Sequence, residues 1–538
     1  MTLNESNRPA WSIENFLELK SNALHIGGAS AVELAERYGT PLFVFSEQRI
    51  FDNIRRLQKA GEVIGCPLKV CYAAKANSLM AILQTVKAAG ADLEVNSGGE
   101  LWKALEVGFA PEQIIFNGTS KEVWEIEDAV NAGIYALQAD SLYELSLIED
   151  VARRLNKTAN VSLRLVPEIE SKTHSGLQTA LLTSKFGMMP DEALSAFHIY
   201  KDSKSLNLCG VHLHIGSQNP ESAPYVHALR ILFENLVKIY NETGKALKHI
   251  NLGGGFPVNY LRDNSHAIEF PQEQREMFAA DFEPSDALEH AWIAVQTAAA
   301  RADAAELLNN LTLLLEPGRS VISDAGVCLT TVRNIKERPF PVAVQGLKDA
   351  IEQTVSPDYD ESNVLLRETA VTSDFYDVND DESRVSSEGA SAWGGGYHVK
   401  TEMAHPKLKS EVWLLTDAGF NILLSMETYK WYYHLISAER ANEPHNFPYK
   451  LAGPLCDGGD VYFDIEGERR LPDYRLLPED VKPNEVLALL NCGAYSIAQM
   501  FQYNGRFLPA VVLIKESGED VLIRKRDEFK DLVNNDVW

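Results

Sequence analysis

The feature that most constrains the fold is a regular alternation of short, β-branched and apolar runs with longer amphipathic segments. Apolar residues recur every three or four positions in segments such as MAILQTVKAAG at 80–90, which is typical of helices. Eight parallel strands joined by crossover helices favour a (β/α)8 barrel of the TIM type, an α/β fold. A doubly wound open sheet is the alternative, but it usually needs fewer units. The strand-like runs are 68–74, 91–95, 114–118, 135–140, 161–165, 209–216, 249–255 and 311–317.

The alternation stops after Arg319. Short strand-like pieces then stand among turns without long helices between them, which predicts a mainly β C-terminal domain over 321–538. The run PLFVFS at 41–46 precedes the barrel. We therefore expect the N-terminal segment 1–47 to join the β domain in part, and the barrel to span 48–320.

Two segments interrupt this plan. One runs from Phe256 to about Asp286, directly after a glycine triplet, and either a lid or surface decoration is consistent with it. The other, at about 348–410, is acidic and polar. We interpret it as a solvated excursion, with a partner-binding role as the alternative.

Charge and composition narrow the function classes. The 538 residues include 50 Lys and Arg against 76 Asp and Glu, and this net charge of −26 argues against a general affinity for nucleic acid or anionic membranes. The six cysteines form no CxxC pair, the N-terminus lacks the order of a signal peptide, and no run of about 18 apolar residues occurs. We expect a cytoplasmic protein that neither spans a membrane nor binds nucleic acid.

The expected strand ends carry an unusual set of side chains. The first strand ends at Lys75, the sixth at His214, the seventh in the triplet Gly253–Gly255, and the eighth in a turn from Glu316 to Arg319. In a barrel of this type reactive groups gather at the carboxyl ends of the strands. Lysine forms imines with aldehydes, glycines let backbone N–H groups approach phosphate, and a carboxylate can keep a pyridinium nitrogen protonated. The set predicts a site for a phosphorylated aldehyde cofactor.

At these positions the chain resembles a known family. The motifs CYAAKAN, EVNSGGEL, SKFG, HIGSQ, NLGGG, EPGR, GPLCDGGD and GAYS stand in the order found in fold-type III pyridoxal-phosphate decarboxylases. Over roughly residues 30–515 the chain resembles diaminopimelate decarboxylase in particular. The resemblance implies pyridoxal 5′-phosphate as cofactor, decarboxylation of an amino acid, and a homodimer whose active sites are shared between subunits.

The resemblance also implies roles for single residues. Lys75 would hold the cofactor as a Schiff base, His214 would stack on its ring, and Glu316 would keep the ring nitrogen protonated, which favours the carbanion left by CO2. Cys456 would enter the partner's site and reprotonate the α-carbon.

No third ligand accompanies His212 and His214, so we expect no metal. The residues expected at the phosphate are Ser217, Gly254, Gly255, Arg319 and Tyr495, and weaker candidates for the cofactor surroundings are Glu94, Asn117, Lys121 and Arg164.

Two departures from the family pattern bear on the substrate. Diaminopimelate decarboxylases usually carry glutamate after the cysteine and arginine in an RPxLY segment, whereas this chain has Asp457 and Ser425 there and keeps the tyrosine as Tyr429. Losing a bidentate arginine costs a few kcal/mol of carboxylate recognition. We therefore expect a paralogue whose substrate carries a distal amine that faces Asp457. Arg319, Tyr429 and Tyr495 are the other expected substrate contacts.

Other interpretations stay open at this point. Lys430 or Arg262 could replace the lost charge, which would make the chain a diaminopimelate decarboxylase proper that produces lysine. A racemase or epimerase on the same barrel would release no CO2 and would need a second base. A catalytically inactive homologue is a third alternative, although such proteins typically lose the lysine or the phosphate-binding residues.

Overall fold

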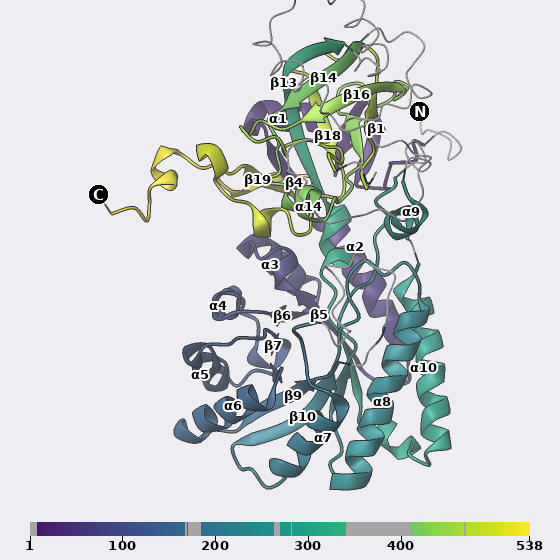
Figure 1. Ribbon diagram of the computed structural model, residues 1–538, viewed down its shortest axis with the longest axis vertical. Coiled ribbons are helices and arrows are strands. Elements are labelled where there is room, and N and C mark those ends of the chain that lie inside the picture. The colour runs from purple at the N-terminus through teal and green to yellow at the C-terminus, as the bar shows by residue number, and fades with distance from the viewer. Residues whose placement is uncertain are drawn as a thin grey trace, which may run out of the picture.

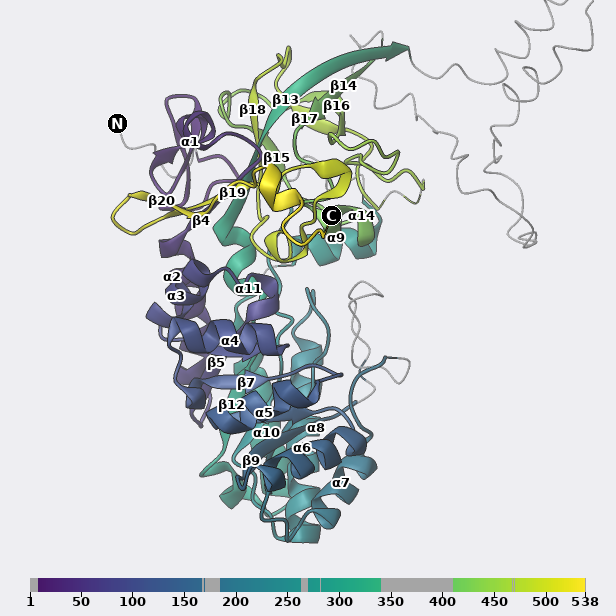
Figure 2. The same ribbon diagram turned by 90° about the vertical axis from the view of Figure 1, so that its left-hand side faces the viewer.

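A computed structural model shows the eight runs as the strands of a closed parallel barrel (Figure 1 and Figure 2). The structure describes residues 8–166, 169, 184–262, 270–280, 282–339, 410–466, 468 and 470–537. Around the barrel the strand order is β10-β11-β12-β5-β6-β7-β8-β9. The predicted (β/α)8 barrel is confirmed, and the open sheet is wrong. The strands are β5 (Leu68–Ala73), β6 (Asp92–Val95), β7 (Ile114–Phe116), β8 (Ala136–Ala139), β9 (Ala159–Arg164), β10 (Leu206–His212), β11 (His249–Asn251) and β12 (Thr312–Leu315).

The barrel helices alternate with these strands. In α4 and α6 the first turn is capped by serine: the hydroxyls of Ser97 and Ser141 accept hydrogen bonds from the backbone N–H groups of Glu100 and Glu144 at 3.2 and 3.1 Å. Of the helices that the structure describes, none is both long and apolar enough to cross a membrane. The helices are α3 (Met80–Ala88), α4 (Gly98–Val107), α5 (Val123–Ala132), α6 (Leu142–Arg154), α7 (Pro190–Ile199), α8 (Ala223–Thr243) and α10 (Pro284–Arg301).

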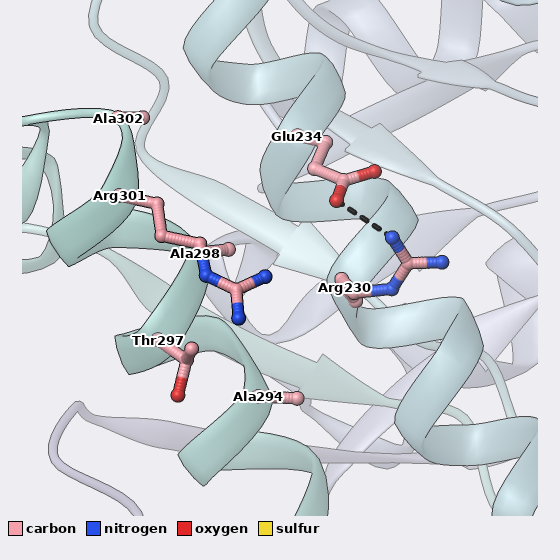
Figure 3. A pocket seen from close by; sticks show the side chains of 7 residues that line it. All are labelled: Arg230, Glu234, Ala294, Thr297, Ala298, Arg301 and Ala302. Atoms are coloured by element: carbon pink, nitrogen blue, oxygen red, sulfur yellow. Dashed lines mark hydrogen bonds and ion pairs between the residues drawn. The ribbon is translucent and has the colours of Figure 1, made fainter.

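Helices α8 and α10 lie side by side on the outside of the barrel (Figure 1). A groove of about 440 Å³ between them is lined by Arg230, Glu234, Thr297 and Arg301 together with small alanines (Figure 3). The Arg230 Nη1 donates to Glu234 Oε1 at 2.8 Å. This groove belongs to the helical exterior and shares no lining residue with the cavity at the strand ends.

The second domain is built on a nine-stranded sheet. A long strand of this sheet, β13 (Gly326–Pro339), pairs with β4 (Leu42–Ser46) in antiparallel orientation (Figure 2). On its other side β4 pairs in parallel with β19 (Ala510–Ile514). The run at 41–46 thus supplies a strand to this sheet. The other strands are β14 (Ser410–Thr416), β15 (Leu435–Ser437), β16 (Phe447–Ala452), β17 (Arg475–Leu477), β18 (Val486–Leu489) and β20 (Asp520–Arg524). The acidic insert expected at about 348–410 lies outside the described residues, apart from Ser410.

The N-terminal segment adds a small separate sheet to this domain. It contains β1 (Leu17–Lys20), β2 (Ala23–Ile26) and β3 (Ala29–Ser30), which pair in that order, and it continues into α1 (Ala31–Tyr38). Its buried side chains, such as Leu24 and Ile26, pack in one cluster with residues of β4 and β19. The segment therefore belongs to the core of the β domain.

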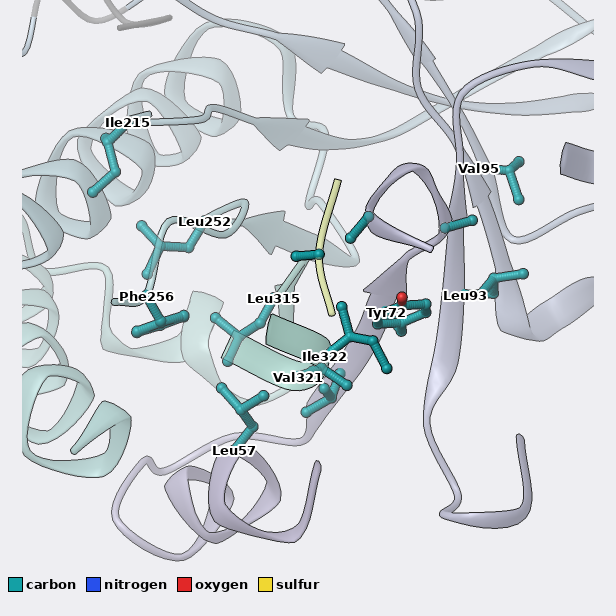
Figure 4. Packing of buried hydrophobic residues seen from close by; sticks show 14 of the residues in the cluster. Leu57, Tyr72, Leu93, Val95, Ile215, Leu252, Phe256, Leu315, Val321 and Ile322 are labelled. Carbon is teal, nitrogen blue, oxygen red and sulfur yellow. The ribbon is translucent and has the colours of Figure 1, made fainter. Parts of the chain in front are cut away.

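The two domains meet at the short helix α11 (Arg319–Ile322), which follows β12. Figure 4 shows the buried side chains there: Val321 and Ile322 lie among Leu315 of β12, Leu57 of α2 (Glu47–Gln58) and Tyr72 of β5. All five side chains are at most 1% exposed. Because α11 is packed from several sides, Arg319 at its start has a fixed position.

Part of the first insert also lies at this junction. Tyr260, Phe270 and Phe278, the last from α9 (Gln272–Ala279), are buried against Trp431 and Tyr432 of the β domain. Ring centres are 5.2 Å apart for Tyr260 and Trp431 and 5.3 Å apart for Phe278 and Trp431, both in edge-to-face geometry. These residues of the insert therefore connect the barrel to the β domain beside the strand ends.

Candidate active site

The carboxyl ends of the barrel strands open into a cavity of about 360 Å³ that the β domain covers. Nine residues predicted from the sequence line it: Lys75, Asn117, Arg164, His214, Ser217, Glu316, Arg319, Tyr429 and Tyr495. The remaining lining residues are Asn96, Gly118, Phe186, His212, Ser425 and Gln499. Residues from both domains therefore surround one small space.

Lys75 and Glu94 form the charged pair nearest the first two strands. Lys75 lies in the turn after β5; its side chain is 42% exposed, and its Nζ is 3.7 Å from Glu94 Oε2. Both Glu94 oxygens are buried without a hydrogen-bond partner. Burial, opposed by the charge of Lys75, raises the pKa of Glu94 to about 7. Burial would lower the pKa of Lys75, but the charge of Glu94 leads the effects that raise it.

Glu316, directly after β12, is a buried carboxylate with three polar neighbours. Asn251 Nδ2 donates to its Oε1 at 2.6 Å and Asn117 Nδ2 donates to its Oε2 at 2.9 Å. The His212 Nε2 is 3.4 Å from the same Oε2. Burial alone would raise the pKa of Glu316, but His212, then Lys75 and the Asn251 amide, hold it far below the ordinary value. The cavity therefore contains a permanent negative charge.

The glycine triplet after β11 brings its backbone against His214 and the Glu316 turn. The backbone N–H of Gly254 donates to His214 Nδ1 at 3.1 Å, and burial holds the pKa of this histidine well below its ordinary value. Gly253 and Gly255 have φ of +69° and +96°. A Cβ on Gly254 would lie 2.3 Å from the Glu316 carbonyl oxygen. Neither Gly254 nor Gly255 lines the cavity itself; both support the residues that do.

Arg319 is fixed by a polar and aromatic enclosure. Its Nε donates to Ser217 Oγ at 3.1 Å and its Nη1 donates to Tyr260 Oη at 3.0 Å. Its guanidinium carbon is 4.1 Å from the ring centre of Trp431 and 5.0 Å from that of Tyr495. The side chain is thus a preorganised cation at one end of the cavity, held by both domains.

Several of these contacts were missed from the sequence. Tyr260, Trp431 and Asn251 had not been assigned, and only the density of aromatic residues at 429–433 offered a signal. Arg164 stacks on Phe186, with its guanidinium carbon 4.1 Å from the ring centre. The Lys121 ammonium donates to two backbone carbonyls and pairs with Glu144 at 2.9 Å, outside the cavity lining, so its role is structural.

Cys456 and Asp457 do not line this cavity. Both are exposed. The backbone N–H of Cys456 donates to Asn504 Oδ1 at 2.7 Å, while Asp457 accepts hydrogen bonds from Gly459 N at 2.9 Å and Tyr503 Oη at 3.2 Å. The loop is therefore held in a defined shape at the surface of the β domain.

Comparison with known proteins identifies this arrangement. Residues 49–323 match the family model described as the pyridoxal binding domain of pyridoxal-dependent decarboxylases, and residues 397–493 match the C-terminal sheet domain of the same family. The chain belongs to this family. The decarboxylase is 30% identical to the diaminopimelate decarboxylase of Methanocaldococcus jannaschii over 97% of its own length and 96% of the relative's. It is also 30% identical to that of Bacillus subtilis, over 96% and 95%.

Solved structures agree with the sequence comparison. The decarboxylase resembles a crystal structure of diaminopimelate decarboxylase from M. jannaschii with a TM-score of 0.73 and 29% identity, covering 97% of this chain and 98% of the other. It resembles a lysine/ornithine decarboxylase from Vibrio vulnificus with a TM-score of 0.59 and 19% identity, covering 90% and 96%, which shows a shared fold. The predicted family, a decarboxylase of amino acids related to diaminopimelate decarboxylase, is confirmed.

Pyridoxal 5′-phosphate is the cofactor of this family, and the cavity fits it. Lys75 presents an exposed amine, Arg319 a buried cation suited to a phosphate, and Glu316 an ionised carboxylate suited to a pyridinium nitrogen. The glycine triplet keeps the backbone open between them, since side chains there would collide with neighbouring backbone atoms. Among the described residues, no group of three His, Cys, Asp or Glu side chains is placed to hold a metal ion.

Proposed function

We propose that this decarboxylase acts, as a homodimer with shared active sites, on an α-amino acid whose side chain ends in an amine and carries no distal carboxylate. The observation that carries this proposal is the neutral wall that α14 (Leu424–Thr428) and its surroundings present to the cavity. The alternative, diaminopimelate as the substrate, needs a cation at that wall.

The residue roles follow from the placement of charges. Bound pyridoxal phosphate supplies an electron sink for the electrons released when the α-carboxylate leaves as CO2. Lys75 would bind the cofactor aldehyde, and Glu316, whose own pKa is low, would keep a proton on the ring nitrogen. His214, which burial keeps neutral, would pack against the ring. Arg319, Ser217 and Tyr495 would hold the phosphate, and Gly254 and Gly255 would keep the adjoining backbone free of side chains.

The wall that faces the substrate consists of Ser425, Tyr429 and Gln499. The Ser425 hydroxyl donates a long hydrogen bond to Gln499 Oε1 at 3.4 Å. The diaminopimelate decarboxylases that the chain resembles usually carry an arginine at position 425, where it pairs with the distal carboxylate. A neutral hydroxyl cannot replace the bidentate, charge-assisted hydrogen bonds of a guanidinium group.

The other cations that the structure describes in the cavity lining already have partners or roles. Of the lining residues, Lys75, Arg164 and Arg319 are cationic; Lys75 is reserved for the cofactor and Arg319 for the phosphate end, while Arg164 stacks on an aromatic ring with Asp140 3.9 Å away. The two residues considered as replacements lie elsewhere. Lys430 is buried and pairs with Glu427 at 3.1 Å, and Arg262 donates to Asn491 Oδ1 at 2.9 Å. Neither lines the cavity.

Steady-state kinetics with diaminopimelate, lysine, ornithine and arginine tests the substrate proposal. We expect CO2 release from one of the three substrates without a distal carboxylate, at a kcat/KM at least about 100-fold above that for diaminopimelate. Ser425→Arg should raise kcat/KM for diaminopimelate by about tenfold or more, and Ser425→Ala, the matched control, should not. Turnover of diaminopimelate alone by the wild-type enzyme would overturn the proposal.

The shared active site is supported by the Cys456 loop. Cys456 is the one exposed cysteine of six, and its loop is hydrogen-bonded to Asn504 and Tyr503 although it does not line the cavity of its own chain. A preformed surface loop with a thiol and a carboxylate suits insertion into a second copy. There Cys456 would donate the proton to the α-carbon and Asp457 would pair with the distal amine. The need for a reduced thiol supports a cytoplasmic location.

Mixing two inactive variants tests this arrangement. Lys75→Ala and Cys456→Ser subunits, each unable to complete a catalytic cycle, should recover about a quarter of wild-type activity when mixed in equal amounts, because half of the dimers then contain one intact site. Lys75→Ala mixed with the double variant carrying both changes is the control and should stay inactive. A monomer by sedimentation, or no recovery on mixing while both variants remain dimeric, would refute shared sites.

A further inference from the structure

A second cavity, of about 800 Å³, lies in the β domain and is separate from the catalytic one. Three arginines line it: Arg333 of β13, Arg506 after the 503–505 turn, and Arg526 after β20. Asp417 is the one carboxylate of its lining. In a chain with a net charge of −26, this concentration of positive charge is unusual. We infer that this cavity binds a small multivalent oxyanion, such as a phosphate or a polycarboxylate, and that the anion acts on the Cys456 loop.

The single carboxylate is occupied by its own neighbours. Asp417 Oδ1 accepts hydrogen bonds from Thr330 Oγ1 at 2.7 Å and Thr331 N at 3.0 Å. Its Oδ2 accepts from Thr40 Oγ1 at 2.7 Å and pairs with Arg333 Nη2 at 2.7 Å. Asp417 therefore forms its ion pair with Arg333, and among the described residues neither Arg506 nor Arg526 forms an ion pair with it, although its charge also acts on Arg526.

These two arginines keep donors available. Among the described residues, Arg506 uses one nitrogen, Nη2, which donates to the Pro454 carbonyl at 2.8 Å. Arg526 likewise uses Nη2, which donates to the Pro41 carbonyl at 2.7 Å and to that of Tyr38 at 3.4 Å. The Nε and Nη1 groups of both remain for a ligand. In a preformed anion site, some guanidinium N–H groups bind protein carbonyls and fix the side chain, and the others remain available to the anion. Arg506 and Arg526 meet both conditions.

The electrostatics favour an anion as the occupant. Burial is the largest cause that lowers the pKa of Arg526; the charge of Asp417 opposes it, and the like charges of Arg333 and Arg524 then lower the pKa further. An oxyanion would relieve that repulsion. Phosphates and carboxylates match the planar fork of a guanidinium group, and a multivalent anion can bridge Arg506 and Arg526. A monovalent anion such as chloride could neutralise only one of them.

The cavity is continuous with the loop that carries Cys456. Gly453, Pro454 and Leu455, which immediately precede that cysteine, belong to its lining. Arg506 holds the Pro454 carbonyl, and Asn504, two residues before Arg506, holds the backbone N–H of Cys456. An anion on Arg506 therefore stiffens the segment from which the thiol projects. The effect on catalysis rests on the proposed shared site, whereas the binding itself does not.

Calorimetric titration of the pyridoxal-phosphate-loaded enzyme with inorganic phosphate and, separately, with citrate tests the site. The loaded enzyme is used because its other phosphate-binding end is then filled. Two guanidinium contacts give an expected Kd of about 1 mM or tighter at constant ionic strength. The tighter of the two anions identifies the chemistry of the occupant. Absence of saturable binding by both would overturn the inference.

Variants locate the binding. Arg526→Gln should weaken it by about tenfold, and Arg526→Lys, which keeps the charge, should recover part of the loss. The matched control is Arg301→Gln, in the groove of Figure 3, where an exposed arginine lies beside the Arg230 and Glu234 pair. An equal loss of binding in Arg301→Gln would show non-specific charge attraction and would refute the site.

The rate at which Cys456 reacts with a thiol reagent measures whether anion binding in the second cavity affects the Cys456 loop. The other five cysteines are buried, and Cys456 is exposed in the single chain and would line the substrate-accessible site of the proposed dimer, so a small thiol-specific disulfide reagent reacts with it selectively. We expect saturating anion to slow the reaction by about threefold or more in the wild-type enzyme and to leave it unchanged in Arg526→Gln. Cys456→Ser should abolish the fast reaction. Binding without any change in this rate would refute the coupling, whatever the outcome of the dimer experiment.

Discussion

Replacing Glu94 with glutamine is expected to change how the stability of the cofactor-free enzyme depends on pH. Glu94 is fully buried and its oxygens have no hydrogen-bond partner, so its protonated form is favoured in the folded state. Its pKa is about 7 in the folded protein against an ordinary value of 4.5. Between these values the folded enzyme binds a proton at Glu94 that the unfolded chain does not bind.

The sign and size follow from that difference. The stabilisation is fully present below pH 4.5 and is lost as the pH rises through about 7. At about 1.4 kcal/mol per pH unit, the loss amounts to about 3 kcal/mol. Glutamine does not titrate. Its amide, also unpaired, adds an offset of about 1–3 kcal/mol that does not vary with pH, so the slope is the informative quantity.

The slope of the unfolding free energy against pH is measured by urea denaturation of the wild-type enzyme and of Glu94→Gln. Both are studied at the same protein concentration from pH 4.5 to 8. The free energy of unfolding of Glu94→Gln minus that of the wild type should increase by about 3 kcal/mol across the range, because groups that do not interact with Glu94 cancel in the difference. Lys75→Ala, which removes the cation that lowers the pKa of Glu94, should extend the loss of stability to higher pH. A difference that stays constant with pH would refute the reasoning.

Three further predictions concern the cofactor. Glu316→Gln should lower kcat for CO2 release by about 100-fold with the cofactor retained, because the ring nitrogen loses its ionised partner; an unchanged kcat would contradict that role. Tyr260→Phe should weaken pyridoxal phosphate binding by about five- to tenfold in an absorbance titration, since Arg319 loses a hydrogen bond, and unchanged affinity would remove Tyr260 as a positioning residue. Lys75→Ala should release the cofactor on dialysis and lack the absorbance band of the lysine-bound form; a persisting band would refute the attachment.

The barrel and the location of the site were predictable because both depend on local patterns. Each of the eight strands is a short apolar run, and parallel topology alone brings the ends of all eight to one rim. Lys75, His214, Glu316 and Arg319 therefore had to lie near one another once the barrel was inferred. Cys456 differs, since its proposed partner is another subunit and nothing within one chain places the two together.

The supports of these side chains were not predictable in the same way. The carboxylate of Glu316 is held by Asn251 and Asn117, which lie 65 and 199 residues earlier in the chain, and Arg319 is held by Tyr260, 59 residues earlier. An asparagine or tyrosine carries no local signature of such a role. Only the packing of an insert against a different domain brings Tyr260 and Trp431 to the guanidinium group.

The contrast between the two ends of the cavity carries the argument about the substrate. At the cofactor end Arg319 and Glu316 are both held in place by hydrogen bonds, so a substitution of either one would disrupt several contacts. At the opposite end Ser425 and Gln499 share one long hydrogen bond, and a change there leaves the cofactor contacts intact. Specificity is a difference of affinities. A second carboxylate buried beside Ser425 would lose its water without gaining a cation, whereas in the proposed dimer an amine directed at the partner's Asp457 would gain one anion.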